Sequence, residues 1–161
     1  MMRTRLSADA RASVMRAADA EARRRGRRRI GTEDLLLGLL TEPGGVASTV
    51  LGRDIEAARS ASARLDTRAL EAVGIRAELS GPPTSRRMRG RLAFTAGARS
   101  AFVRAVRLAQ QDHTGRVTAA HLTAGVLSAR APDDAIALVE AMGVDVATAL
   151  ERATASSLGT Q

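Results

Sequence analysis

The sequence contains no cysteine, lysine, tryptophan or tyrosine, and only two phenylalanines and two histidines. The absence of cysteine excludes disulfide bonds, thiolate metal sites and a cysteine nucleophile. The absence of lysine excludes the lysine of a P-loop, a Schiff-base lysine and the strand lysine of protein kinases. We interpret the histidines, His113 and His121, as a loop residue and a helix-face residue, and no serine or aspartate recurs at a spacing that suggests a catalytic triad. We therefore expect a protein that is not an enzyme and uses no metal or cofactor.

Long apolar runs are also missing. The longest uncharged apolar run is far shorter than the roughly 18 residues that span a bilayer. Residues 1–5 lead into a polar, alanine-rich segment instead of the apolar core of a signal peptide. The 161 residues, 45% of them hydrophobic, suffice for one ordinary domain or two small ones. These features predict a soluble, cytoplasmic protein with no membrane partner.

Positive charge is concentrated in one segment. All 25 basic residues are arginine, the net charge is +8, and six of the arginines lie between Arg23 and Arg29. A second, weaker cluster consists of Arg86, Arg87, Arg89 and Arg91. Such a run is usually the solvated end of a helix. It also suits acidic surfaces or phosphates, so one alternative function is a basic nucleic-acid-associated protein that acts through Arg23 to Arg29. The scarcity of aromatic residues leaves only non-specific binding at low salt.

The chain contains an internal duplication. Residues 6–22 and 94–109, whose starts are 88 residues apart, share apolar residues at spacings of three and four, which is typical of a helix. Each is followed by a short polar stretch and a compact apolar helix, at 30–40 and at 117–127. No segment alternates with period two, so we predict no strands. The predicted fold class is all-α, with two pseudo-twofold-related four-helix repeats packed on each other.

Domain boundaries follow from helix-ending residues. A third match, between residues 70–75 and 139–144, pairs two helices that end at a glycine. Residues 81–85, Gly-Pro-Pro-Thr-Ser, separate the copies, because proline and glycine end helices. The first copy is the longer one, and the helix register of its surplus, at about 46–67, stays open. The predicted domains are a first repeat at 1–80 with a possible insertion at about 46–67, a linker at 81–91, a second repeat at 92–155 and a tail at 156–161.

One family shares these motifs. Residues 30–39 read IGTEDLLLGL, and the second copy carries a weaker version at 117–126 that includes His121. The arginine-bearing helices open with Leu6-Ser7 and Phe94-Thr95. The pattern resembles the double Clp-N domain of Clp-family AAA+ unfoldases, whose signature is close to IGTEHLLLGL. The resemblance covers roughly residues 4–152, although the chain lacks the ATPase modules of that family.

The resemblance implies a non-catalytic, all-α domain that binds client proteins, peptides and adaptors of an unfoldase–protease machine. In some members the domain docks phosphorylated arginine, and in actinobacterial relatives it binds cyclic peptide antibiotics. A copy without ATPase modules would be an accessory or a decoy of a Clp protease system, with Clp components as possible partners.

The start of the helix at 30–40 is the first candidate site. Free N–H groups at a helix start favour an anion, and the Glu33 carboxylate suits a guanidinium. A phosphoarginine carries both groups, and neighbouring arginines would contact its phosphate. The predicted ligand-binding residues are Thr32, Glu33, Arg5, Arg11, Arg28 and Arg29. A second interpretation stays open, because Thr32 as N-cap before two acidic residues is also an ordinary stable helix start. The second copy has Ala119-Ala120 here, so at most one such site is expected.

An apolar groove between the repeats is the second candidate site. We predict that Leu6 and Phe94, the equivalent first residues of the two arginine-bearing helices, line this groove. Phe94 and Phe102 lie four residues apart, so both are otherwise expected to pack in the core of the second repeat.

Overall fold

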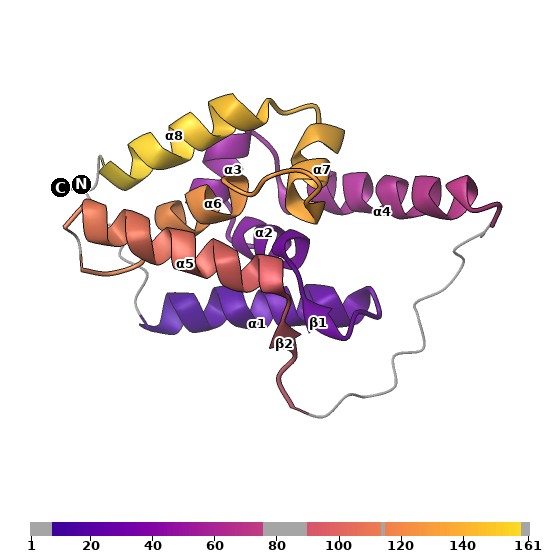
Figure 1. Ribbon diagram of the computed structural model, residues 1–161, viewed down its shortest axis with the longest axis horizontal. Coiled ribbons are helices and arrows are strands. Elements are labelled where there is room, and N and C mark those ends of the chain that lie inside the picture. Colours follow the sequence, from indigo (N-terminus) through magenta and orange to yellow (C-terminus); the bar gives the residue numbers. More distant parts are fainter. Residues whose placement is uncertain (1–7, 76–89, 114, 159–161) are drawn as a thin grey trace.

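The computed structural model of the protein describes residues 8–75, 90–113 and 115–158. This part of the chain forms eight helices, four before the gap at 76–89 and four after it (Figure 1). The first half contains α1 (Ala8–Arg24), α2 (Thr32–Leu40), α3 (Val46–Leu51) and α4 (Ile55–Ala72). The second half contains α5 (Ala96–Gln111), α6 (Ala119–Leu127), α7 (Asp134–Ala141) and α8 (Val146–Leu158). None of these helices is long and apolar enough to cross a membrane.

Two short strands join the halves. β1 (Arg29–Ile30) precedes α2, β2 (Ala93–Phe94) precedes α5, and the two pair in parallel, with Ile30 opposite Phe94. The prediction of no strands was therefore wrong for these residues. Strands of two residues are too short to produce an alternating apolar pattern, so they leave no signal of their own in the sequence.

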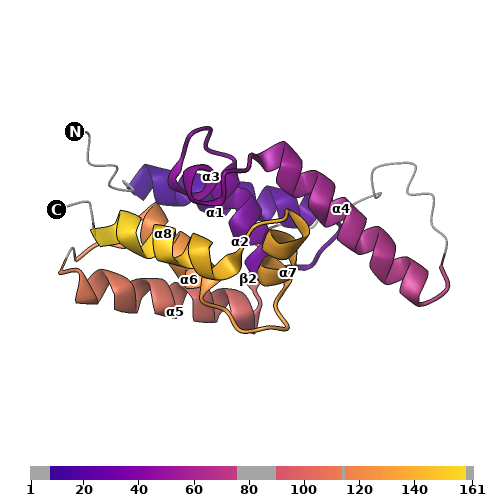
Figure 2. The same ribbon diagram turned by 90° about the horizontal axis from the view of Figure 1, so that it is seen from above.

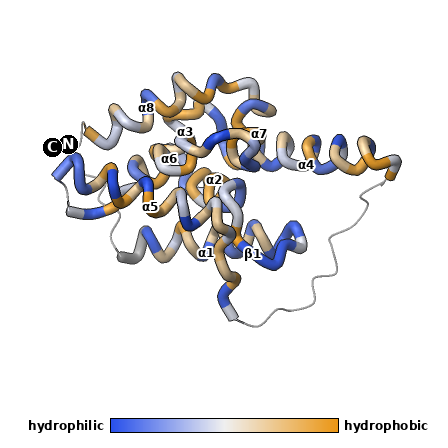
Figure 3. The backbone as a smooth tube through the Cα atoms, in the orientation of Figure 1, coloured by the Kyte–Doolittle hydropathy of each residue, from blue (hydrophilic) through white to orange (hydrophobic). Residues whose placement is uncertain are grey.

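The two apolar helices α2 and α6 form the centre of the molecule. All nine residues of α2 and all nine of α6 are buried. A short helix that is apolar on every side is stable only when other helices surround it. In Figure 2, α1, α3 and α4 run along one side and α5 and α8 along the other, while the far end of α4 projects from the body. The arginine-rich stretch between α1 and β1 is strongly hydrophilic (Figure 3).

Two glycines set how closely the helices of each half approach. A Cβ atom on Gly38 of α2 would lie 2.9 Å from the carbonyl oxygen of Val14 in α1. A Cβ atom on Gly125 of α6 would lie 2.5 Å from the carbonyl oxygen of Ala101 in α5. Val14 is thus equivalent to Ala101, whereas the predicted spacing of 88 pairs Val14 with Phe102. The prediction was wrong by one residue, because neighbouring alanines in both helices make either alignment plausible.

The third and fourth helices of the first half lie within residues 46–75. Gly52 follows α3 at φ 61°, and Gly143 follows α7 at φ 71°, so these two glycines end equivalent helices. The predicted match of 70–75 with 139–144 was wrong, because Gly74 follows the fourth helix of its half. α4 has 18 residues and α8 has 13, which accounts for surplus length in the first copy. Most of the predicted linker, residues 81–89, lies outside the described residues.

Candidate binding site

The start of α2 is tied to the second half. Gly31 is its N-cap, and the Asp34 carboxylate accepts a hydrogen bond from the Gly31 N–H at 2.8 Å. The expectation that Thr32 is the N-cap was wrong, since Thr32 is the first helical residue. Its hydroxyl donates to the carboxylate of Asp133 at 3.0 Å. Asp133 is the N-cap of α7 and also accepts from the Ala135 N–H. Thr32 therefore joins the starts of two helices, one from each half.

Glu33 is paired with arginines of its own chain. Its side chain is buried, with the Arg25 guanidinium 2.6 Å and the Arg27 guanidinium 2.9 Å from its Oε2 atom. Arg25 also contacts Asp66 of α4, and Arg27 contacts Asp134 of α7. The carboxylate that was expected to bind a ligand guanidinium is thus already neutralised by two guanidinium groups of the protein.

The other residues predicted for this site are dispersed. Arg28 and Arg29 are exposed on the segment before α2. Arg11 is exposed on α1, 14 residues before Arg25 in the sequence, or about 20 Å along a helix. Arg5 and Leu6 lie outside the described residues. The structure therefore places Thr32 and Glu33 side by side but does not bring Arg11 to them.

Burial controls the pKa values in this network. Burial raises the pKa of Asp34, and the opposing effects of the Gly31 N–H and of the positive charges of Arg27 and Arg25 do not cancel it. Burial alone would lower the pKa of Arg25, but its pairing with Glu33 and Asp66 outweighs burial and raises it. Arg25 is held as a cation inside a cluster of carboxylates.

The arginine run is mostly neutralised within the protein. Its ion pairs are Arg23 with Asp19, Arg24 with Glu21, Arg25 with Glu33 and Asp66, and Arg27 with Glu33 and Asp134. Among the described residues, only Arg28 and Arg29 of this run have no carboxylate partner. The ion pairs of the run connect α1, α2, α4 and α7, so most of its positive charge is not available as a free cationic surface. Of the second cluster, Arg86, Arg87 and Arg89 lie outside the described residues.

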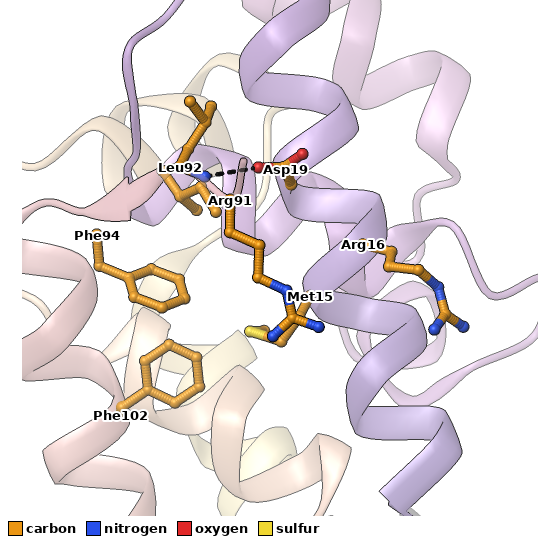
Figure 4. A pocket seen from close by; sticks show the side chains of 8 residues that line it. Met15, Arg16, Asp19, Arg91, Leu92, Phe94 and Phe102 are labelled. Atoms are coloured by element: carbon orange, nitrogen blue, oxygen red, sulfur yellow. Dashed lines mark hydrogen bonds between the residues drawn. The ribbon is translucent and has the colours of Figure 1, made fainter. Parts of the chain in front are cut away.

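A cavity of about 370 Å³ lies between α1 and α5, beside the paired strands. Its apolar lining consists of Met15 of α1, Ile30 of β1, Leu92, Phe94 of β2 and Phe102 of α5. The rings of Phe94 and Phe102 meet edge to face, with centroids 5.3 Å apart (Figure 4). Both halves of the chain thus build this cavity, and Phe94 lines it. Sequence reasoning missed Met15, although the corrected alignment makes it the counterpart of Phe102.

Charged residues surround the cavity. Asp19 accepts hydrogen bonds from the Arg23 side chain at 2.6 Å and from the Leu92 N–H at 3.1 Å. Burial would raise the pKa of Asp19, but these hydrogen bonds and the charges of Arg23 and Arg91 lower it overall. In Figure 4 the Arg91 side chain extends across Met15, while Arg16 points outward from α1. Arg16 and Arg91 are exposed and form no ion pair with a carboxylate in the described ranges. Sequence reasoning did not place either arginine here.

His121 belongs to a separate, buried network. Its Nδ1 atom is 3.0 Å from the Thr118 backbone nitrogen, and its Nε2 atom is 2.7 Å from a carboxylate oxygen of Asp112. Because the backbone N–H can only donate, Nδ1 is the acceptor, and Nε2 carries the proton that is donated to Asp112. The histidine caps α6 and joins it to the end of α5. We assign it a structural role.

Two four-helix halves of the same helix order, packed around two buried central helices, make up the fold of a Clp N-terminal domain. The solved structure of the N-terminal domain of the caseinolytic protease associated chaperone ClpD from Arabidopsis thaliana superimposes with a TM-score of 0.65, at 19% sequence identity. The match covers 97% of this chain and 96% of that chain. No family model matches the sequence, and no curated protein matches it. The predicted all-α fold of the Clp-N type is confirmed.

Proposed function

We propose that the protein is a non-catalytic module that binds peptide segments of other proteins in the cavity between α1 and α5, within a Clp protease system. The observation that carries this proposal is the cavity itself, which lies where the halves meet and is lined by apolar residues of both. The likeness to the N-terminal domain of ClpD, a protease-associated chaperone, supports the same class of function.

The lining suits apolar side chains. A volume of about 370 Å³ falls within the range of known ligand sites. Phe94 and Phe102 form a rigid aromatic wall, whereas the flexible thioether of Met15 adapts to ligands of different shape. A site with one rigid and one adaptable wall suits a module that binds many different sequences.

The cavity is a better candidate than the start of α2. Glu33 is paired with Arg25 and Arg27 through its Oε2 atom, and its Oε1 atom is buried, so the carboxylate is not open to a ligand guanidinium. The cavity is open in comparison, because the apolar side chains of Phe94 and Phe102 are only partly buried.

Binding of fluorescein-labelled peptides, measured by anisotropy, tests this proposal. Peptides rich in leucine and phenylalanine should bind, and Phe94→Ala should weaken their binding about tenfold, because it removes one wall of the cavity. Val106→Ala, at an exposed position of α5 outside the cavity, is the matched control. Circular dichroism shows that each variant is folded. Equal affinities of wild type and Phe94→Ala would contradict the assignment.

The same assay with labelled duplex DNA addresses the nucleic-acid alternative. Because four arginines of the run are in ion pairs, we expect DNA binding only at low salt. Binding that persists at physiological salt and is lost in the Arg28→Gln, Arg29→Gln double variant would favour the alternative.

A further inference from the structure

We propose that the cavity recognises the last residue of a peptide, with an apolar side chain against Phe94 and Phe102 and a free α-carboxylate held by Arg91. This inference rests on the proposed function, because it names the kind of peptide that the same cavity binds. It follows from the position of the charges around the cavity.

The first step concerns the positive charges. Arg91 extends over the cavity, across Met15, and Arg16, which also lines the cavity but points outward from α1, adds a second positive charge (Figure 4). Neither of them forms an ion pair with a carboxylate of the described residues, although the positive charge of Arg91 is near enough to Asp19 to help lower the pKa of that carboxyl. A guanidinium beside an apolar cavity is a suitable partner for a carboxylate, which it can bind through two parallel hydrogen bonds.

The second step concerns the acidic residue of the lining. Asp19 would repel an incoming carboxylate if its charge were free. Its charge is instead balanced by the Arg23 side chain, which donates to Oδ2, while Oδ1 accepts from the Leu92 N–H, so both oxygens already have a partner within the protein. The charge that remains for recognition is therefore positive.

The third step concerns the size of the ligand. An internal residue of a peptide offers either an apolar side chain or a carboxylate, whereas the last residue offers both from one Cα atom. A cavity of about 370 Å³ is at the small end of the range for ligand sites, so it suits one or two side chains of a peptide. The combination of an apolar cavity and an adjacent arginine thus fits a chain end better than an internal acidic residue, and capture of C-terminal carboxylates is a known mode of peptide recognition.

Three labelled peptides test the inference by fluorescence anisotropy. The first ends in leucine with a free carboxylate, the second is the same peptide with an amidated end, and the third is amidated and carries glutamate before the leucine. We expect the free acid to bind about tenfold more tightly than the amide, as for a charge-assisted hydrogen bond. Arg91→Gln should remove this preference, Arg16→Gln should reduce it, and Arg107→Gln, an exposed arginine elsewhere on α5, should leave it unchanged. The preference should also shrink as salt is raised.

The other outcomes separate the inference from the proposed function. If acid and amide bind equally and Phe94→Ala weakens both, the carboxylate site is refuted and the apolar cavity stands. If the internal glutamate peptide binds as tightly as the free acid, recognition of the chain end is refuted. If no peptide binds, or if Phe94→Ala changes nothing, the proposed function fails and the inference fails with it.

Discussion

Asp34 and His121 occupy equivalent positions in the two halves, and each accepts a hydrogen bond from the backbone N–H three residues before it. Each also faces a partner at the end of the preceding helix. Arg25 lies 3.7 Å from Asp34, and Asp112 lies 2.7 Å from His121. The backbone N–H of the N-cap residue is bound in the same way in both halves. The acidic residue of the pair is at the helix start in the first half, where it is Asp34, and at the end of the preceding helix in the second half, where it is Asp112.

The raised pKa of Asp34 makes a prediction about stability and pH. The folded state binds a proton at Asp34 more readily than the unfolded state, whose carboxyl has its ordinary pKa near 3.8. The contribution of this group to stability is therefore full below pH 3.8 and is lost as the pH rises through the folded-state pKa. Asp34→Asn keeps an acceptor for the Gly31 N–H but cannot ionise. Relative to wild type, the variant should gain stability between pH 4 and pH 7 in urea titrations, and a difference that is constant or falls over this range would contradict the prediction.

Glu33→Gln should lower stability and leave peptide binding intact. The substitution leaves the half-buried Arg25 without its nearest carboxylate, although Asp66 stays in contact with it, and loss of such a charged partner costs about 1–3 kcal/mol. Thermal unfolding measures this loss, and Glu71→Gln, at an exposed position of α4, is the control. The opposite result, unchanged stability with weakened ligand binding, would show that Glu33 contacts the ligand and does not mainly stabilise the fold.

Gly125→Ala should destabilise the protein although alanine is normally the better helix former. A Cβ atom at 2.5 Å from the Ala101 carbonyl oxygen forces α5 and α6 apart, and such overpacking costs about 1–3 kcal/mol. Gly38→Ala, whose nearest contacts are 2.9 Å, should have a smaller effect. Urea unfolding of both variants measures which one is more destabilised. A Gly125→Ala protein more stable than wild type would show that α5 and α6 can move apart without cost.

Thr32→Val should weaken the connection between the halves. The substitution removes the hydrogen bond to Asp133, whose loss costs about 1.5–3 kcal/mol for a charged acceptor. Thr49→Val, at an exposed position of α3, is the matched control. Equal urea midpoints for the two variants would mean that the Thr32 hydroxyl contributes nothing to the packing of the halves.

The sequence predicted the helical fold and the duplication because leucine and alanine spacing is local information. The predicted alignment of the α1 sequence with the α5 sequence was off by one residue. Only the contacts of Gly38 and Gly125 show that Ala101, and not Phe102, is the counterpart of Val14. The ion-pair partners of the arginine run could not be predicted from the sequence either. Asp66 and Asp134 are far from Arg25 and Arg27 in the sequence, and only the packing of α4 and α7 on α2 brings them together. Phe94 was predicted for the groove from its position at the start of its repeat, whereas Arg91 was not, because only the packing of the halves places it at the cavity.

The hydrogen bond from Thr32 to Asp133 has no counterpart across the pseudo-twofold axis, because Ala119 begins α6 and Gly45 precedes α3 at the equivalent positions. The ion pair from Arg27 to Asp134 likewise exists on one side only, since Val46 is the first residue of α3. The first half therefore supplies Thr32 and Arg27, the second half supplies Asp133 and Asp134, and symmetry does not repeat either connection. A half paired with a second copy of itself would lack both connections, so the two halves are complementary partners and not interchangeable ones.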